Sequence, residues 1–234
     1  MKIKLVLLLI GIAMMQFAAA QTVGGFWSVS EVMVGTRKMT PVAKWFKFRE
    51  DGTCTGGNGW TQNSVGTWSF SEKTQELVPT NELGIKDDFG PFKVNFLGDT
   101  MKWTRQEEGM AVTVSLVQIQ EMPPAPADLV KGLWALSKVE NSDGDWISNF
   151  DLNRKQFILI RPDMRFRLRN PDESISQGFW HMDGHRPLLT LINYDRNVSY
   201  KEYTISFENE TLIMKSNDEG GNTYRYSRTG QFPE

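Results

Sequence analysis

The chain has 234 residues, of which 40% are hydrophobic, 12% aromatic and 23% charged, and its formal net charge at pH 7 is −2. Eight tryptophans and this apolar share suffice for a folded core and exclude an intrinsically disordered chain. The weakly acidic balance also argues against a nucleic-acid-binding protein, whose surface is basic.

Residues 1–20 have the three parts of a secretory signal peptide. Lys2 and Lys4 form a basic start, residues 5–15 are an apolar run, and Ala20 ends a small-residue cleavage site. The apolar run is too short for a membrane span, and no later stretch is long and apolar enough for one. We therefore expect an exported protein with no stable membrane anchor, periplasmic or extracellular after cleavage near Ala20. Loss of the two lysines would change its net charge to −4.

The remaining sequence repeats itself once. Gly25-Phe26-Trp27 recurs as Gly132-Leu133-Trp134, and Gly66-Thr67-Trp68 recurs as Gly178-Phe179-Trp180. Three further pairs of short segments match in the same order, and the offset stays between 107 and 112 residues. Ordered matches at so constant a spacing indicate an internal duplication.

A Pro/Ala-rich segment separates the two copies. Residues 122–128 contain Met122-Pro123-Pro124-Ala125-Pro126-Ala127, a composition that favours an extended, semi-rigid linker and excludes a place inside a sheet. The sequence therefore predicts two homologous domains, 22–121 and 129–230, joined by this linker.

Apolar and polar residues alternate within each copy with the period of a β-strand. The strands expected in the first copy are 45–49, 53–57, 65–70, 93–96, 101–104 and 111–119. Those expected in the second copy are 157–160, 165–169, 176–182, 188–192, 203–207, 211–215 and 223–226. Residues 77–86 and 150–155 are the candidates for a helical turn.

Short strands separated by turns at intervals of roughly 8–12 residues indicate a β-sandwich or a closed barrel. Consecutive hairpins favour an up-and-down meander, and closure removes its exposed edges. The expected fold is therefore all-β, with two small antiparallel meander β-barrels in tandem. A barrel of roughly eight strands has room inside for its own side chains or for one small ligand.

The Gly-x-Trp that opens each copy resembles the first strand of lipocalins and fatty-acid-binding proteins, the calycin group. Two tandem domains of this size look most like the lipocalin-like domain proteins exported by Bacteroidetes-type bacteria. The resemblance implies barrels in which Trp27 and Trp134 plug one end, and small hydrophobic ligands. It also implies an arginine stacked over the tryptophan. Arg225 or Arg228 fits that role in the second copy, whereas residues 114–118 of the first copy contain no arginine.

The four repeated tryptophans, Trp27, Trp134, Trp68 and Trp180, are the first candidates for functional residues. A tryptophan buries a large area and its indole N–H needs one partner, so aromatic residues at strand spacing usually belong to the core. We therefore expect structural positions shared by the two copies, with ligand contact as the alternative.

Both histidines of the protein lie in one short segment. On a continuous strand His181, Asp183 and His185 would share one face and form a trio of metal ligands. Asp183-Gly184 is a hairpin signal, however, which would place the histidines on opposite arms near an exposed tip. We favour the hairpin and expect no metal.

Arg165, Arg167 and Arg169 alternate with Phe166 and Leu168. An inward arginine face would form a carboxylate or phosphate site, whereas an outward face would be solvated or would bind a partner. Because Phe166 and Leu168 are the natural core pair, we expect the arginines to face outward.

Cys54 is the only cysteine, so no intrachain disulfide forms. It lies far from the cleavage site, which excludes lipidation as a lipoprotein. Its repeat partner is Phe166, so we expect a buried core thiol rather than a nucleophile. Gly56 to Gly59 lacks the lysine of a phosphate-binding loop and is expected to form a turn.

These patterns contain no enzymatic constellation and call for no cofactor, so we expect a protein that is not an enzyme. The first hypothesis is a binding protein that holds a small hydrophobic ligand in a calycin-like barrel. The alternative is an interaction or surface-assembly module with solid barrels, which binds a protein partner. An enzyme using a barrel mouth is the least supported hypothesis.

Overall fold

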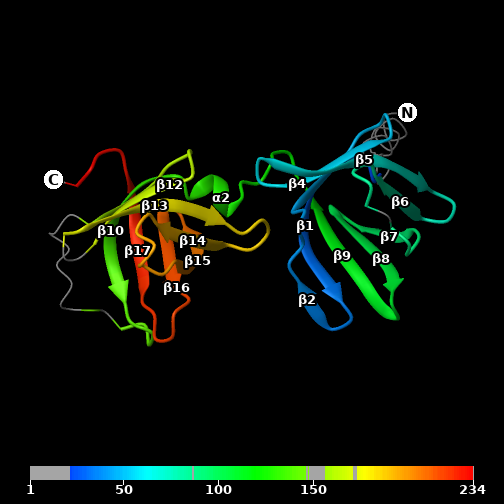
Figure 1. The fold of residues 1–234 in the computed structure, drawn as a ribbon. Coiled ribbons are helices and arrows are strands. Elements are labelled where there is room, and N and C mark those ends of the chain that lie inside the picture. Colours follow the sequence, from blue (N-terminus) through cyan, green and yellow to red (C-terminus); the bar gives the residue numbers. More distant parts are fainter. Residues whose placement is uncertain (1–21, 86, 146, 148–155, 171–172, 234) are drawn as a thin grey trace, which may run out of the picture.

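The structure, a computed structural model, describes residues 22–85, 87–145, 147, 156–170 and 173–233. The expected signal peptide lies outside the described residues. Strands dominate both halves of the chain, and each half closes into an antiparallel barrel (Figure 1). The prediction of an all-β fold with two tandem meander barrels related by duplication is confirmed.

The first barrel closes because its first and last strands pair with each other. The strands follow one another around the wall in chain order, and β1 joins β9. A ninth strand, β2, extends β1 as a hairpin arm outside the closed ring of eight. The strands are β1 (Gly25–Val34), β2 (Arg37–Met39), β3 (Trp45–Phe48), β4 (Thr53–Asn58), β5 (Thr61–Ser71), β6 (Glu76–Asn81), β7 (Phe92–Leu97), β8 (Thr100–Glu107) and β9 (Met110–Gln118).

The second barrel repeats this plan without the extra arm. It is a closed ring of eight antiparallel strands in which β10 pairs with both β11 and β17. The strands are β10 (Gly132–Glu140), β11 (Phe157–Ile160), β12 (Arg165–Arg169), β13 (Ile175–Met182), β14 (Leu188–Asn193), β15 (Lys201–Glu208), β16 (Thr211–Ser216) and β17 (Thr223–Thr229).

The duplication extends to individual hydrogen bonds of the tryptophans. Trp27 Nε1 donates to the carbonyl oxygen of Val23 at 2.9 Å, and Trp134 Nε1 donates to that of Val130 at 2.8 Å. The second pair behaves alike, since Trp68 Nε1 donates to the Arg49 carbonyl and Trp180 Nε1 to the Arg161 carbonyl. Each of these four indole N–H groups therefore donates to a backbone carbonyl, at the same place in both copies.

The same agreement appears in the backbone. Each barrel has a register shift in its first strand, between Val29 and Glu31 in β1 and between Leu136 and Lys138 in β10. Such bulges bend a strand and increase its twist, which helps a sheet to close. The shift lies at equivalent positions, so the first strand bends at the same place in both barrels.

Three local expectations are wrong or untested. Glu76–Asn81 is strand β6 rather than a helical turn, because it pairs with β5 and buries Leu77 completely. Gly56 and Gly57 belong to strand β4, and only Gly59, at a φ of 57°, makes the expected turn. The other candidate helical turn, 150–155, lies outside the described residues.

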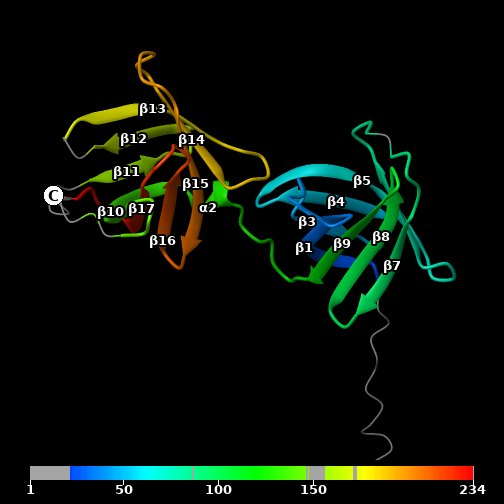
Figure 2. The ribbon, with the colours of Figure 1, turned by 90° about the horizontal axis from the view of Figure 1, so that it is seen from below.

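Only the end of the linker departs from the extended form that its composition predicts, since residues 122–125 are not helical and Ala125 has an extended backbone. Proline is favoured in the first turn of a helix, and Pro126 begins a one-turn helix, α2 (Pro126–Leu129). The Asp128 carboxylate accepts from the backbone N–H groups of Ala125 and Trp60, so it ties the helix to the first barrel. Figures 1 and 2 both show α2 between the two barrels. Within the described ranges, no helix has the length and apolarity needed to cross a bilayer.

The glycine that is repeated in β5 and β13, Gly66 and Gly178, offers a test of the packing. A Cβ on Gly178 would lie 1.8 Å from the carbonyl oxygen of Ile192, and one on Gly66 would lie 1.9 Å from that of Thr80. Gly178→Ala should therefore lower the free energy of unfolding by about 1–3 kcal/mol in urea denaturation followed by circular dichroism.

Gly184→Ala is the matched control, because no heavy atom lies within 4 Å of the Cβ it would introduce. Equal stability of Gly178→Ala and the unchanged protein would contradict this packing.

Candidate functional site

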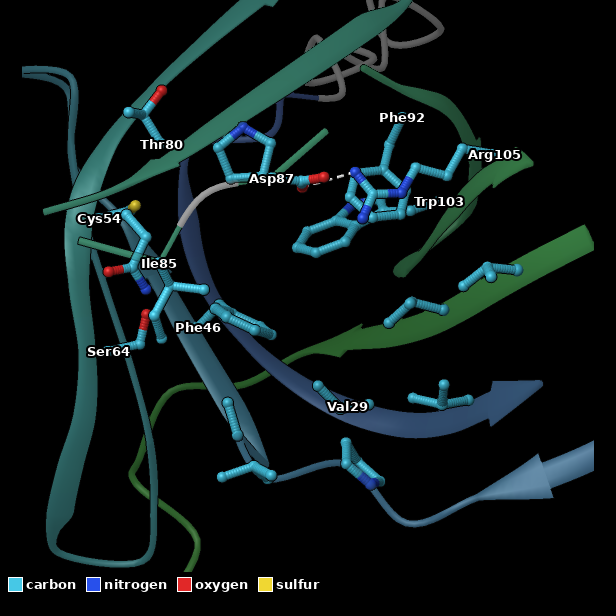
Figure 3. Close-up of a pocket in the computed structure, with 18 of the residues that line it drawn as sticks. Val29, Phe46, Cys54, Ser64, Thr80, Ile85, Asp87, Phe92, Trp103 and Arg105 are labelled. Atoms are coloured by element: carbon cyan, nitrogen blue, oxygen red, sulfur yellow. Dashed lines mark hydrogen bonds and ion pairs between the residues drawn. The ribbon is translucent and has the colours of Figure 1, made fainter. Parts of the chain in front are cut away.

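The first barrel contains a cavity of about 420 Å³ at one end of the ring (Figure 3). Its wall includes Val32 and Val112, which lie near the far end of β1 and the beginning of β9. Trp27 lies at the opposite end, where β1 begins and pairs with Gln118. The cavity therefore opens away from the tryptophan, and its volume is in the range of roughly 300–1,000 Å³ typical of small-molecule sites.

Small side chains in the first copy create this space. The strand registers place Cys54 where the second barrel has Phe166, since each pairs with the repeated glycine, Gly66 or Gly178. By the same registers Gly56 corresponds to Leu168, because they pair with Ser64 and Ser176. A thiol thus replaces a phenyl ring at the cavity wall. At Gly56 the place of the missing side chain is taken by Phe46, because a Cβ on this glycine would lie 2.9 Å from the Phe46 ring.

The last strand contributes a third difference. Val114 pairs with Val32 and Trp103, whereas Tyr224, at the corresponding place, pairs with Val139 and Met214. A valine in place of a tyrosine leaves the volume of a phenol ring unfilled, and Val114 lines the cavity.

Tyrosines fill the interior of the second barrel instead. The ring centroids of Tyr203 and Tyr224 are 6.2 Å apart, and those of Tyr224 and Tyr226 are 6.5 Å apart. Burial raises the pKa of Tyr203 and of Tyr226 far above the ordinary value of a phenol. The hollow at the corresponding mouth, beside Phe166 and Leu168, measures about 260 Å³.

One wall of the first-barrel cavity is aromatic. Trp103 packs against Phe46, Phe48 and Phe92, with ring centroids 5.5, 5.7 and 5.6 Å away. Its Nε1 is buried and has no hydrogen-bond partner among the residues that the structure describes. Buried polar groups normally have a partner, so this indole N–H is a donor that the described part of the chain leaves unused.

A charged cluster forms the rim of the same cavity. Arg105 Nη1 lies 2.6 Å from Asp87 Oδ2, and Arg105 Nε lies 2.5 Å from Glu107 Oε1. The arginine side chain is only 10% exposed and its guanidinium stacks 3.9 Å from the centre of the Phe92 ring. Figure 3 shows Asp87 and Arg105 pointing toward one another across the cavity from Cys54 and Thr80.

Cys54 lies in the opposite wall and is 8% exposed. Burial raises the pKa of its thiol, and the negative charge of Glu82 raises it further. A raised pKa reduces the thiolate fraction at neutral pH, which fits the expected inert core thiol rather than a nucleophile.

The four repeated tryptophans do not line the cavity. Trp27 and Trp134 occupy equivalent buried positions, with 3% and 1% of their surface exposed. Trp180 is buried and Trp68 is partly buried at the next pair of equivalent positions. They close and support the barrels, and the cavity wall is built from other residues.

Of the two arginines that fit the stacking role in the second copy, Arg228 occupies the place. Its guanidinium lies 4.1 Å from the centre of the Trp134 ring and donates to the carbonyl oxygens of Lys131 and Leu129. Gly132 opens this strand at a φ of 145°, which residues with a side chain rarely adopt, and a Cβ there would also lie 2.6 Å from Arg228 Nη1.

Arg225 points elsewhere and forms ion pairs with Glu140 and Glu208. In the first copy Gln118 pairs with Trp27 as Arg228 pairs with Trp134, so glutamine replaces the arginine there.

His181, Asp183 and His185 are not brought together as a group of three potential ligands in the described residues. No group of three potential metal ligands occurs in the part of the chain that the structure describes. β13 ends at Met182 and β14 begins at Leu188, so Asp183 and His185 lie in the connecting loop. The side chain of Arg186 and the backbone N–H groups of His185 and Arg186 hold the pKa of the Asp183 carboxyl far below its ordinary value.

The alternating strand β12 faces as expected. Phe166 is buried and Leu168 packs against the same core, while Arg165 and Arg167 are exposed and Arg169 is half-buried. Arg169 lies 3.7 Å from the Glu173 carboxylate. The arginines therefore belong to the outer surface and do not form an anion site inside the barrel.

Comparison with protein-family models gives no match to this chain, and neither does comparison with curated proteins.

Sequence reasoning missed most of the cavity, including Arg105, Trp103 and Val114. The signal that would have revealed it is present in the repeat. The aligned copies differ by loss of side-chain volume at Cys54, which matches Phe166, and a core position that loses volume in one copy marks space in that copy when no neighbour fills it.

The contribution of Arg228, which stacks over Trp134, can be tested by replacing it with glutamine, the residue at the equivalent place in the first barrel. Arg228→Gln removes one stacked cation and two charge-assisted hydrogen bonds to exposed carbonyls. We expect a loss of about 1 kcal/mol in the unfolding free energy, measured by differential scanning calorimetry.

Arg167→Gln, on the outer surface of β12, serves as the control and should leave the transition unchanged. A decrease of the same size in both variants would show that Arg228 has no special role.

Proposed function

We propose that this protein is a binding protein whose first barrel holds one small, largely apolar molecule in its cavity. The observation that carries the proposal is the difference between the copies. The same fold contains a cavity of about 420 Å³ where Cys54 and Val114 replace Phe166 and Tyr224 of the second barrel. Protein interiors are normally close-packed, so a cavity of this size in a duplicated domain is a candidate ligand site.

The chemistry of the wall supports an apolar ligand. Most of the lining comes from aliphatic and aromatic side chains, with Phe46, Phe92 and Trp103 on one side. Apolar surface removed from water contributes roughly 25 cal/mol per Å². The binding energy would therefore come mainly from burial, with the polar rim selecting the end of the molecule that faces out.

In this proposal the second barrel has a supporting role. Its core includes Trp134, Phe166 and Tyr226, and its interior offers less space for a ligand. The proposal also includes export, because residues 1–20 have the features of a signal peptide, and membership of the lipocalin-like group, because of the paired Gly-x-Trp motifs. No enzymatic step is assigned to either barrel.

An exposed apolar patch favours a second candidate function, an interaction module. Phe179, Ile192 and Tyr194 are about half exposed on the outer face of β13 and the end of β14. The Phe179 and Tyr194 rings pack edge to face at 5.2 Å. Such patches often mark protein contacts. A finding that the cavity binds no ligand would favour the interaction module over the binding protein.

Filling the cavity tests the first function. Val114→Tyr introduces the residue that the second barrel has at the same place, and it should reduce binding of an environment-sensitive apolar fluorophore at least tenfold, or about 1.4 kcal/mol. The readout is fluorescence titration of the mature protein.

Tyr224→Val, the reciprocal change in the second barrel, is the control and should leave binding to the first barrel intact. Undiminished binding by a folded Val114→Tyr variant would place the fluorophore outside the cavity and contradict the proposal.

Cys54 provides an independent report on occupancy. Because the thiol is buried and its pKa is raised, alkylation at neutral pH should be much slower than in urea. A bound ligand should slow it further, since Cys54 lines the cavity. The rate can be followed by mass spectrometry, and fast alkylation that ligand does not affect would argue against an enclosed site.

A further inference from the structure

The charged groups of the cavity wall allow the ligand class to be narrowed, on the assumption that the proposed binding function is correct. Among the described lining residues, the charged groups are Asp87, Arg105 and Glu107. Two carboxylates surround one guanidinium, so this rim carries a net charge of −1. An arginine in a cavity usually suggests an anionic ligand, but here its charge is already neutralised by the protein.

The contacts show which donors of Arg105 are already used. Nη1 donates to Asp87 and to the carbonyl oxygen of Gly90 at 2.9 Å, and Nε donates to Glu107. Among the described residues no acceptor takes a hydrogen bond from Nη2. Stacking on Phe92 fixes the plane of the guanidinium, so Nη2 is a donor held in a defined orientation at the rim.

The unused polar groups select against both kinds of charged ligand. A carboxylate would add a second uncompensated negative charge beside Asp87 and Glu107, whose side chains are 38% and 26% exposed, and the like charges would repel one another. An ammonium group carries only donors and has no acceptor to offer to Arg105 Nη2 or to the buried Trp103 Nε1. An uncharged oxygen acceptor satisfies a donor without adding charge.

We infer that the cavity of the first barrel takes a neutral amphiphile, an apolar chain or ring system that ends in an uncharged oxygen acceptor such as an ester or a ketone. Arg105 Nη2 donates to that oxygen at the rim. Asp87 and Glu107 hold the guanidinium in place and repel free fatty acids.

The test compares three probes with the same ten-carbon chain: methyl decanoate, decanoate and decylammonium. The affinity of each probe is measured by its ability to displace the apolar fluorophore from the mature protein at neutral pH and low ionic strength. The ester should bind at least about tenfold more tightly than decanoate, which corresponds to about 1.4 kcal/mol, and more tightly than decylammonium.

The outcomes separate the two proposals. Failure of all three probes to displace the fluorophore would overturn the binding function itself. Displacement in which decanoate or decylammonium equals or exceeds the ester would overturn the neutral class and leave the binding function standing.

A charge variant identifies the cause of the selectivity. Glu107→Gln removes one carboxylate of the rim, so decanoate should gain severalfold in affinity relative to the ester. Glu108→Gln, one residue further and outside the cavity wall, should change neither the affinity for decanoate nor that for the ester. Asp87→Asn repeats the test at the other carboxylate, and an unchanged ratio in both rim variants would refute the electrostatic explanation.

Discussion

Each domain depends on a single closing contact, the pairing of its first strand with its last. β1 pairs with β9 and β10 pairs with β17, and in both cases a tryptophan at the start of the first strand is held by a carbonyl four residues earlier. Closure removes the free edges that a meander would otherwise expose. It also encloses a fixed interior volume, so the size of the inward side chains decides whether a barrel is solid or hollow.

The two copies resolve this constraint in opposite ways. In the second barrel, Phe166, Leu168 and Tyr224 fill the space between the walls. In the first barrel the equivalent residues are small. Phe46 packs over Gly56 and Trp103 lies beside Val114, but a cavity remains between Cys54 and Val114. A duplicated fold is well suited to this division, because the solid copy retains stability while the hollow copy gives up packing energy for a cavity.

The fold was largely predictable from the sequence because its signals are local and repeated. Alternation and turn residues located most strands, and the paired Gly-x-Trp segments identified the duplication. Glu76–Asn81 was misjudged because a short segment carries both helical and strand features, and only its pairing with β5 decides between them. The α2 turn was missed because proline both disrupts sheets and begins helices. The cavity was not predictable from patterns in one copy, since Arg105, Asp87 and Cys54 approach one another only after closure.

The segment around α2 serves both barrels at once. The Asp128 carboxylate accepts a hydrogen bond from the Trp60 backbone in the first barrel, while the carbonyl oxygens of Leu129 and Lys131 accept from Arg228 in the second. Lys131 Nζ also lies 5.2 Å from the centre of the Trp60 ring. Wherever the chain were divided between the repeats, at least one of these contacts would be lost. Each repeat is a complete barrel, but both barrels use the segment around α2 for contacts at their ends.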